Sequence, residues 1–291
     1  MNSLKRVTKK ILSYFIKRYK LPRGDGFISV YDEIGAKKIN FFWRPDSFME
    51  TRLYQYGIYG NWEKTSLRVW ALLSKESKTI LDIGANTGIY SLIARSNNNL
   101  AKIIAVEPIE INYQVLQKNI EANAFNIIAE KIAISDYDGN AKMYMLKDRL
   151  NYMTSINDNR YELHPEVSKG SEVIEVNIDV RIYSFLKHKY KVDKLDLVKI
   201  DVEGHEVNVL KSLILDIKSS RPAILIEIIG DDNALEINEL LSGLEYKFFS
   251  IDEETGRVVC VKKLWDNDHQ NFLICTQNHI DYLNSSKFFI G

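Results

Sequence analysis

Residues 79–94 read TILDIGANTGIYSLIA, and this stretch decides the fold that the sequence predicts. A short apolar run ends at Asp82, Gly84 and Gly88 bracket a tight turn, and apolar residues then recur at helical spacing. The pattern predicts a buried strand, a glycine loop and a helix. Glycines let the backbone approach a ligand closely, and free N–H groups gather at the start of the helix. Such a unit usually opens a nucleotide-type cofactor site in an open α/β sheet.

A second acidic residue, Glu107, ends the next apolar run, at residues 102–106. It follows the loop by roughly 20 residues, where a carboxylate accepts hydrogen bonds from ribose hydroxyls. NAD would require G-x-G-x-x-G, but Asn86 stands where the second glycine belongs. Asp82 suits an ammonium better than a pyrophosphate, which favours S-adenosylmethionine (SAM) over NAD. The alternative is structural, with Asp82 capping a turn and the glycines serving packing.

Strand and helix patterns alternate after the loop. They predict an α/β fold with a doubly wound, mostly parallel sheet, an antiparallel final strand and helices on both faces. The expected strands are 102–106, 127–134, 140–146, 172–180, 195–200, 223–229, 246–251, 257–261 and 272–276. The expected helices are 110–123, 182–188, 206–216 and 233–241. The polar segment 147–171, with Asn151, Thr154, Ser155 and His164, is long for a loop and suggests a lid or substrate loop.

Two segments precede the cofactor domain, which we place at residues 67–291. Residues 1–24 hold eight Lys/Arg and no acid, with apolar residues at helical spacing. They could form an amphipathic helix on anionic lipid, a solvated helix or a frayed tail, and they do not resemble a secretory signal. Residues 25–66 form an N-terminal cap rich in aromatic residues, with a hairpin at 28–34 and 37–43 and helices at 46–56 and 63–74. Its aromatic side chains serve either a core or an acceptor pocket.

Composition narrows the possible partners. Lys+Arg and Asp+Glu are equal at 39 each, which argues against nucleic acid. No apolar run approaches the roughly 18 residues that span a bilayer. Cys260 and Cys275 lack metal-ligand spacing, and we assign no metal from the sequence. We expect both cysteines to be buried thiols in a reducing, cytoplasmic compartment, with a disulfide as the alternative.

The second informative stretch is DLVKIDVEGHEVNVL, residues 196–210. A buried strand ends at Asp201, so Asp82, Glu107 and Asp201 should gather at the carboxyl edge of the sheet. Lys199 and Asp201 alternate onto one side of this strand. Glu227 lies within an apolar run, so it must be paired or face a polar site.

Structural roles compete for several of these residues. Asp201 could be a helix N-cap, Glu203 and Glu206 could be first-turn acids, and Lys199 and Glu227 could form an ion pair. We favour a structural role for Glu206 alone. His205 is either a general base or a surface histidine. Methyl transfer to a hydroxyl benefits from a base or a metal, and Asp201, Glu203 and Glu227 suit either role.

Five segments together carry a family resemblance: DIGANTGIYSL, VEP, AISDYDG, KIDVEGHEVNVL and RPAILIEI, in that order. They resemble the FkbM family of SAM-dependent methyltransferases over roughly residues 59–230. The resemblance implies a class I methyltransferase (Rossmann-like) fold and O-methylation of a hydroxyl on a sugar, glycan, polyketide or related small molecule. Acceptor choice would then reside in the first 58 and last 60 residues. The rivals are an NAD-binding Rossmann enzyme and a catalytically silent SAM-fold module that binds a partner or membrane.

The resemblance also implies roles for individual positions. Gly84, Asn86, Thr87 and Gly88 would hold the methionine end of SAM, with Asp82 beside its ammonium. Glu107 and Pro108 would lie at the ribose. The adenine would be flanked by Ile109, Ala133 and Ile134. Asp201 would lie near the transferred methyl and Glu63 at the pocket entrance, whereas His205 occupies a position that varies in the family.

Overall fold

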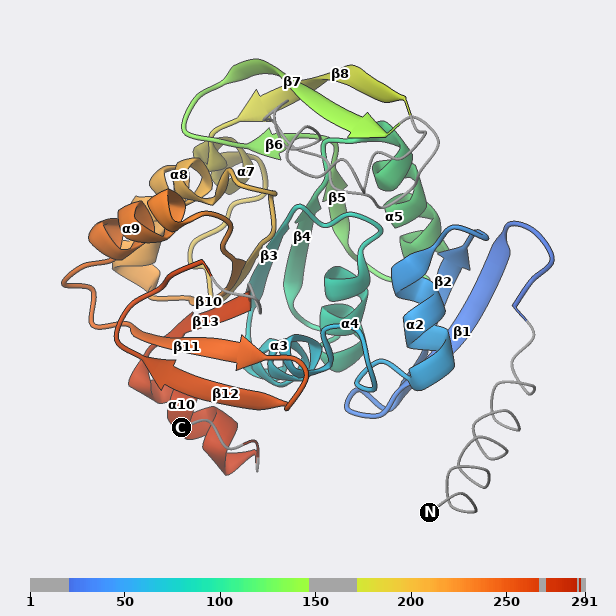
Figure 1. The fold of residues 1–291 in the computed structure, drawn as a ribbon, viewed down its shortest axis with the longest axis horizontal. Helices are drawn as coiled ribbons and strands as arrows, with labels where there is room; N and C mark the ends of the chain where they lie inside the picture. The colour runs from blue at the N-terminus through green and yellow to red at the C-terminus, as the bar shows by residue number, and fades with distance from the viewer. Residues whose placement is uncertain (1–20, 147–171, 267–270, 287, 289–291) are drawn as a thin grey trace, which may run out of the picture.

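The core of the protein is an eight-stranded sheet of order β12-β11-β13-β10-β9-β3-β4-β5 (Figure 1). The computed structural model describes residues 21–146, 172–266, 271–286 and 288. The strands are β3 (Thr79–Ile83), β4 (Lys102–Val106), β5 (Ile128–Glu130), β9 (Leu197–Ile200), β10 (Ala223–Glu227), β11 (Lys247–Asp252), β12 (Arg257–Val261) and β13 (Asn271–Cys275). The five from β10 to β5 run parallel, whereas β13 is antiparallel to both of its neighbours, as predicted for the final strand.

Helices cover both faces of this sheet, which confirms the doubly wound fold. One face carries α3 (Lys64–Glu76), α4 (Ile89–Asn97), α5 (Glu110–Ala122) and α10 (Gln277–Ser285). The other carries α7 (Tyr183–Lys189), α8 (Glu206–Ser220) and α9 (Asp231–Leu240). Successive strand residues supply the two cores in turn, because side chains alternate across a strand. Ile80 therefore packs with the first group of helices and Leu81 with the second.

One predicted strand is wrong in its extent. Residues 127–134 form β5 and then, after a break, β6 (Ala133–Ile134), which belongs to a separate three-stranded sheet of order β6-β8-β7. The other strands of that sheet are β7 (Gly139–Leu146) and β8 (Val173–Arg181). An apolar run shows which residues are buried but not which neighbour they pair with, so the change of sheet left no signal. The expected lid, residues 147–171, lies outside the described residues.

The aromatic-rich segment contains the predicted hairpin of β1 (Gly26–Asp32) and β2 (Lys37–Trp43), followed by α2 (Phe48–Tyr56). Its buried residues, among them Phe41 and Leu53, belong to the same hydrophobic cluster as α3 and α4. Other aromatic side chains, including Phe27 and Phe48, are exposed. Core packing therefore accounts for only part of the aromatic density. The basic segment lies almost entirely outside the described residues, which begin at residue 21.

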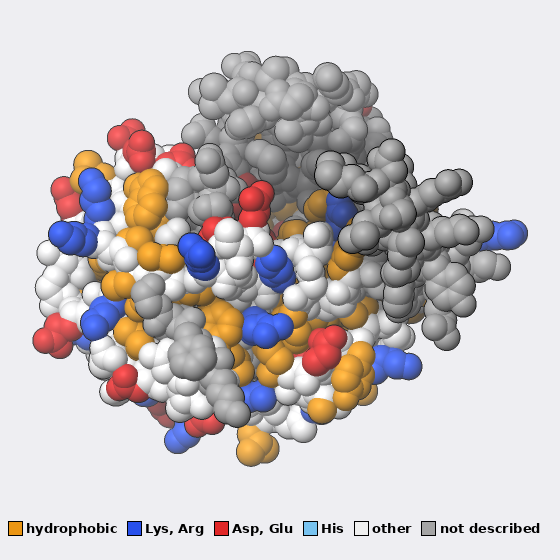
Figure 2. Space-filling view, turned by 60° about the horizontal axis from the view of Figure 1, so that its bottom comes forward, with side chains coloured by type: hydrophobic (Ala, Val, Ile, Leu, Met, Phe, Trp, Pro, Cys, Tyr) orange, Lys and Arg blue, Asp and Glu red, His pale blue; other side chains and the backbone are white. Residues whose placement is uncertain are grey.

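Charged side chains of both signs are mixed on the surface. Figure 2 shows Lys/Arg and Asp/Glu side chains interspersed over one face. None of the described helices is both long and apolar enough to cross a membrane.

Both cysteines are free, and Cys275 is buried, as predicted. The prediction of a buried Cys260 is wrong: it lies on the outermost strand, β12, of which only Val258 is buried.

Candidate functional site

A pocket opens at the carboxyl ends of the parallel strands. Asp82 comes from the end of β3, Glu107 follows β4, Asp201 follows β9, and Glu227 ends β10. The predicted gathering of Asp82, Glu107 and Asp201 is confirmed. The predicted site residues that line this pocket are Asp82, Gly84, Asn86, Thr87, Glu107, Pro108, Ala133, Ile134, Asp201, Glu203, His205 and Glu227.

Two predicted cofactor residues are not among the described residues that line the pocket. Gly88 has a φ of 90°, and a Cβ there would lie 2.4 Å from Leu116 Cδ1, so this glycine serves helix packing. The side chain of Ile109 packs in a small apolar cluster with Met143 and Val180. Its backbone N–H instead donates to Glu107 Oε1 at 2.9 Å. Ile109 thus acts on the site through its main chain.

The glycine loop is held against the ends of two strands. The N–H groups of Gly84 and Ala85 donate to the Val106 carbonyl at 3.0 and 2.9 Å. A Cβ at Gly84 would lie 1.8 Å from the Asp201 carbonyl oxygen, so only glycine fits this close approach. Asn86 adopts a left-handed conformation, with φ 51°. Its side-chain oxygen is buried and has no hydrogen-bond partner among the described residues. A buried acceptor in this state suits a donor group of a ligand.

Glu107 is fixed beside the loop and is only 4% exposed. Its two oxygens accept hydrogen bonds from the N–H groups of Ile109 and Asn86, each at 2.9 Å. Burial raises the pKa of the Glu107 carboxyl to about 7, although these hydrogen bonds oppose the rise. An ionised carboxylate has about four acceptor positions, so capacity remains for hydroxyl donors of a ligand.

Asp82 is more deeply buried, at 1% exposure. Ser91 Oγ, on α4, donates to Asp82 Oδ2 at 2.6 Å. Burial raises the pKa of the Asp82 carboxyl to about 6, while the Ser91 hydrogen bond and the charge of Lys199 lower it. Asp82 is therefore a buried acceptor that a cationic ligand group would hold in the ionised state.

The N-terminal segment supports the loop through Thr87. Thr87 Oγ1 donates to Glu50 Oε1, on α2, at 2.7 Å. Asn119 Nδ2 donates to the Thr87 carbonyl at 2.8 Å, and Asn119 Oδ1 accepts from the N–H of Phe42, on β2. Glu50 is fully buried, and burial raises the pKa of its carboxyl. Residues of the segment that precedes the cofactor domain thus hold the glycine loop in place.

We expect Glu50→Ala to weaken both the fold and the site. The change leaves the buried Thr87 hydroxyl without its acceptor, which costs about 1–3 kcal/mol of unfolding free energy. Because Thr87 belongs to the loop, affinity for S-adenosylhomocysteine should fall as well. Urea unfolding and calorimetric titration check the two effects. Glu50→Gln is the matched control, since it keeps an acceptor oxygen for Thr87 and should lose less stability and less affinity. Wild-type stability and affinity in Glu50→Ala would contradict this role of Glu50.

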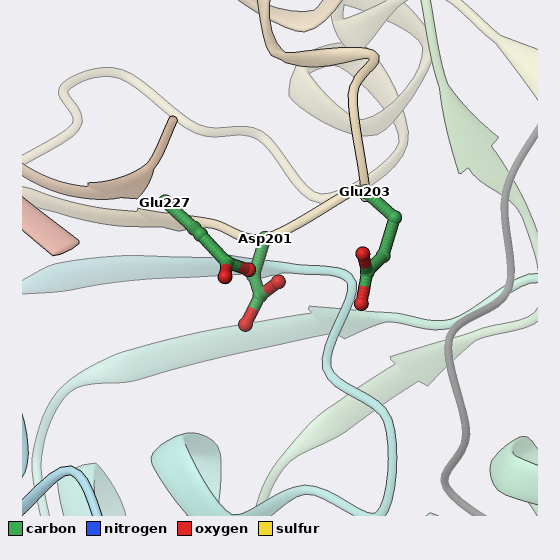
Figure 3. A group of neighbouring side chains, drawn as sticks. All are labelled: Asp201, Glu203 and Glu227. Atoms are coloured by element: carbon green, nitrogen blue, oxygen red, sulfur yellow. The ribbon is translucent and has the colours of Figure 1, made fainter. Parts of the chain in front are cut away.

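Three carboxylates that line the pocket form a cluster at the carboxyl ends of β9 and β10. The side chains of Asp201 and Glu227 lie side by side, and Glu203 extends toward the same space (Figure 3). Their ligand oxygens all lie within 4.8 Å of one another, a spacing that a divalent cation can bridge. The ammonium of Lys199, however, lies 3.2 Å from Asp201 Oδ2 and already supplies positive charge. Carboxylates in this arrangement can accept a proton from a ligand hydroxyl.

The turn after β9 positions this cluster. Glu203 and Gly204 have φ values of 56° and 99°, and α8 begins at Glu206 with His205 as its N-cap. Asp201 is therefore not the N-cap, because it lies four residues too early. Glu203 also precedes the first turn of the helix. The structural role of Glu206 is confirmed, since its buried carboxylate accepts from the Gly204 N–H at 2.7 Å.

His205 lies at the edge of the pocket and is partly buried. Its Nε2 lies 2.9 Å from Ser135 Oγ, and it is not a freely exposed surface histidine. Burial lowers its pKa, although the charge of Asp136 opposes the change. The imidazole is thus favoured in the neutral form that a general base requires.

Sequence reasoning missed Tyr90, in the first turn of α4. Its hydroxyl donates to Glu63 Oε2 at 2.5 Å, and its ring centre lies 5.1 Å from Lys199 Nζ. Glu63 lines the pocket and adopts a left-handed φ of 41°, while its predicted place at the entrance stays a prediction. Trp62 and Met49 add apolar surface to the same pocket. Lys199 was the feature of the sequence that could have indicated Tyr90, because a lysine within a fully buried strand requires partners.

A parallel sheet with a glycine loop and acids at its carboxyl edge is typical of an α/β protein of the doubly wound class, in which ligands bind at that edge. Residues 82–248, more than half of the chain, match the methyltransferase FkbM domain. The chain belongs to the FkbM methyltransferase family, which confirms the resemblance carried by its motifs. The doubly wound, mostly parallel sheet described above agrees with the fold expected from that resemblance.

Individual relatives are more distant. "Methyltransferase 1" of Beauveria bassiana is 30% identical over 148 residues, which cover 46% of this chain and 57% of that protein. "Hexuronic acid methyltransferase AglP" of Haloferax volcanii is 23% identical over 184 residues, 62% of this chain and 68% of that protein. The chain spans 57% and 60% of the length of the first two curated relatives. The match to the solved FkbM methyltransferase of Methylobacillus flagellatus covers 68% of this chain and 43% of that one. Its sequence identity is 17% and its TM-score is 0.45.

Proposed function

We propose that the protein is a SAM-dependent O-methyltransferase that acts on a hydroxyl of a sugar, glycan or secondary metabolite. The observation that carries this proposal is the meeting of Asp82, Glu107 and Asp201 in one pocket around the glycine loop. The free thiols of Cys260 and Cys275 are consistent with the reducing cytoplasm as its location.

The donor and acceptor atoms of the pocket fit SAM. Asp82 offers a buried carboxylate to an ammonium, Glu107 offers one to ribose hydroxyls, and Asn86 presents an unpartnered acceptor oxygen. Among the described residues that line the pocket, Lys199 and His205 are the only basic ones. Lys199 is already paired with Asp201, so the loop offers no cationic side chain to a pyrophosphate. These features favour SAM over NAD.

With Asp82 at its ammonium and Glu107 at its ribose, SAM would supply an electrophilic methyl group for transfer to the acceptor hydroxyl. The protein must orient the hydroxyl and remove its proton. Asp201 is the proposed proton acceptor. Glu203, Glu227 and His205 line the same pocket and are the further candidates for accepting this proton.

The acceptor is proposed to be a hydroxylated molecule with some apolar surface. Trp62, Met49 and Met143 line the pocket beside the acids, and an indole ring suits the apolar face of a sugar. The relative whose name records action on a hexuronic acid supports the carbohydrate class. A glycan or a small hydroxylated metabolite is therefore the first acceptor to test.

Calorimetric titration with S-adenosylhomocysteine, with NAD as the control, tests the proposal. Binding of S-adenosylhomocysteine alone supports the cofactor and justifies a screen of sugar and polyketide acceptors with methyl-labelled SAM. Binding of NAD alone would overturn the interpretation of the glycine loop. Binding of neither would favour the silent module, and comparison of liposome binding by the full chain and by a chain starting at Asp25 would then test a membrane role.

A further inference from the structure

A lysine is buried at the centre of the sheet beneath the candidate site. Lys199 is 1% exposed, and β9 lies between β10 and β3 with all four of its residues buried. Burying an ammonium without partners costs several kcal/mol, so its surroundings must offset that cost. Its Nζ lies 3.2 Å from Asp201 Oδ2 and 5.1 Å from the centre of the Tyr90 ring. The lysine thus has one direct ionic partner and one aromatic face.

Titratable groups from several elements lie around this ammonium and Asp201. They are Glu63 before α3, Asp82 on β3, Tyr90 on α4, Glu203 and His205 after β9, Glu206 on α8 and Glu227 on β10. Glu253, after β11, faces Glu63 and Tyr90 instead. Burial alone lowers the pKa of the Lys199 ammonium, but Asp201, Glu63 and Glu227 outweigh it and the pKa is raised. Lys199 therefore stays charged.

Asp201 and Glu227 differ in their relation to this charge. Asp201 pairs directly with Lys199, and its side chain is 29% exposed to the pocket. Burial raises the pKa of Glu227 well above its ordinary value, and the neighbouring charge of Asp201 raises it further. Two adjacent carboxyl groups cannot both ionise cheaply, so one of them retains a proton. The ion pair with Lys199 favours the ionised form of Asp201 over that of Glu227.

We infer that Lys199 is a positioning residue that holds Asp201 in place as the ionised member of the pair and leaves the shared proton on Glu227. This inference rests on the proposed function, in which Asp201 accepts the proton of the acceptor hydroxyl. A base must be unprotonated and fixed before the hydroxyl arrives. The ammonium meets both requirements, since it favours the charged carboxylate and contacts it from the buried side. Glu227, neutral, avoids a second uncompensated charge.

Carboxyl-carbon NMR tests this inference without any acceptor. The full chain, labelled with carbon-13 in aspartate and kept in metal-free buffer, is titrated with acid, and Asp201→Asn identifies the Asp201 signal. In Lys199→Met, the midpoint of the Asp201 titration should rise by at least about one pH unit, because an opposite charge at this distance shifts a carboxyl by about 1–3 units. Lys199→Arg, which keeps the charge, should restore most of the original midpoint.

Lys102→Met is the matched control, on strand β4, which β3 separates from β9. Lys102 Nζ donates to the carbonyls of Tyr190 and Lys191, away from the pocket, so its loss should leave the Asp201 midpoint unchanged. An unchanged midpoint in a folded Lys199→Met protein would overturn the inference. If Lys199→Met does not fold, the Asp201 midpoint is compared between Lys199→Gln and Lys199→Arg instead. Equal midpoints in these two variants would also overturn the inference.

The same samples separate this inference from the proposed function. S-adenosylhomocysteine binding depends on the glycine loop and Glu107, whereas the Asp201 midpoint depends on Lys199. A protein that does not bind S-adenosylhomocysteine but shows the shift refutes only the function. Once an acceptor is found, the acid limb of kcat/KM should move to higher pH in Lys199→Met, because the base then protonates at higher pH. A purely structural lysine would lower activity equally at all pH values.

Discussion

Replacing Asp201 by Asn should lower turnover by about 10²–10⁴-fold, the usual contribution of a general base, while affinity for S-adenosylhomocysteine changes little. Asparagine keeps the shape of the side chain but cannot take a proton from the acceptor hydroxyl. It also exchanges the ion pair with Lys199 for a weaker contact. Turnover is measured with methyl-labelled SAM and the acceptor identified in the screen, and cofactor affinity is measured by calorimetry.

Asp196→Asn is the control for this prediction. Asp196 lies just before the opposite end of β9 and accepts hydrogen bonds from the N–H groups of Lys78 and Thr79, far from the carboxyl edge. Its loss should reduce stability without reducing turnover per folded molecule. Full activity of Asp201→Asn would remove Asp201 from the mechanism. A loss of S-adenosylhomocysteine affinity as large as the loss of turnover would place Asp201 in cofactor binding instead.

Replacing Glu107 by Ala should weaken S-adenosylhomocysteine binding by about 1–3 kcal/mol, roughly 5–150-fold, because charge-assisted hydrogen bonds to the ribose are lost. Glu107 also tethers the N–H groups of Asn86 and Ile109, so part of the loss reflects a looser loop. Calorimetry on the full chain measures the change. The matched control is Glu110→Ala, since Glu110 is exposed and pairs with Lys131 on the surface.

An analogue of S-adenosylhomocysteine without the ribose 2′-hydroxyl separates the two contributions. Wild-type protein should prefer the intact ligand, whereas Glu107→Ala should bind both ligands almost equally, because the partner of that hydroxyl is gone. Unchanged affinity for the intact ligand in Glu107→Ala would refute the ribose assignment. A loss that is the same for both ligands would assign Glu107 to loop support alone.

The elements nearest the glycine loop were predictable because their signals are local. The apolar run to Asp82, the turn through Gly84 and the helix after Gly88 follow from residue spacing alone, and the structure reproduces them as β3, loop and α4. The position of Glu107 follows from the next strand. Since parallel strands end at one edge, the meeting of these acids with Asp201 also followed from the sequence.

The features that were missed depend on partners distant in the chain. The run 127–134 divides between two sheets because β6 pairs with β8, about 45 residues later. Cys260 is exposed because its strand lies at the sheet edge, which its own composition does not reveal. Thr87 is supported by Glu50 across 37 residues of sequence. Apolar periodicity records burial along one segment and carries no information about which other segment provides it.

Five motifs of the sequence carried the resemblance to the family. Strand spacing and glycine placement encode the doubly wound sheet and the acids along its carboxyl edge, so these features followed from the sequence. How those acids differ from one another became apparent only in the packed structure. Lys199 contacts Asp201, Glu227 lies partly buried beside Asp201, and Tyr90 donates a hydrogen bond to Glu63. Charge states in a buried cluster depend on distances of a few ångströms between different strands and helices, and those distances exist only once the chain is packed.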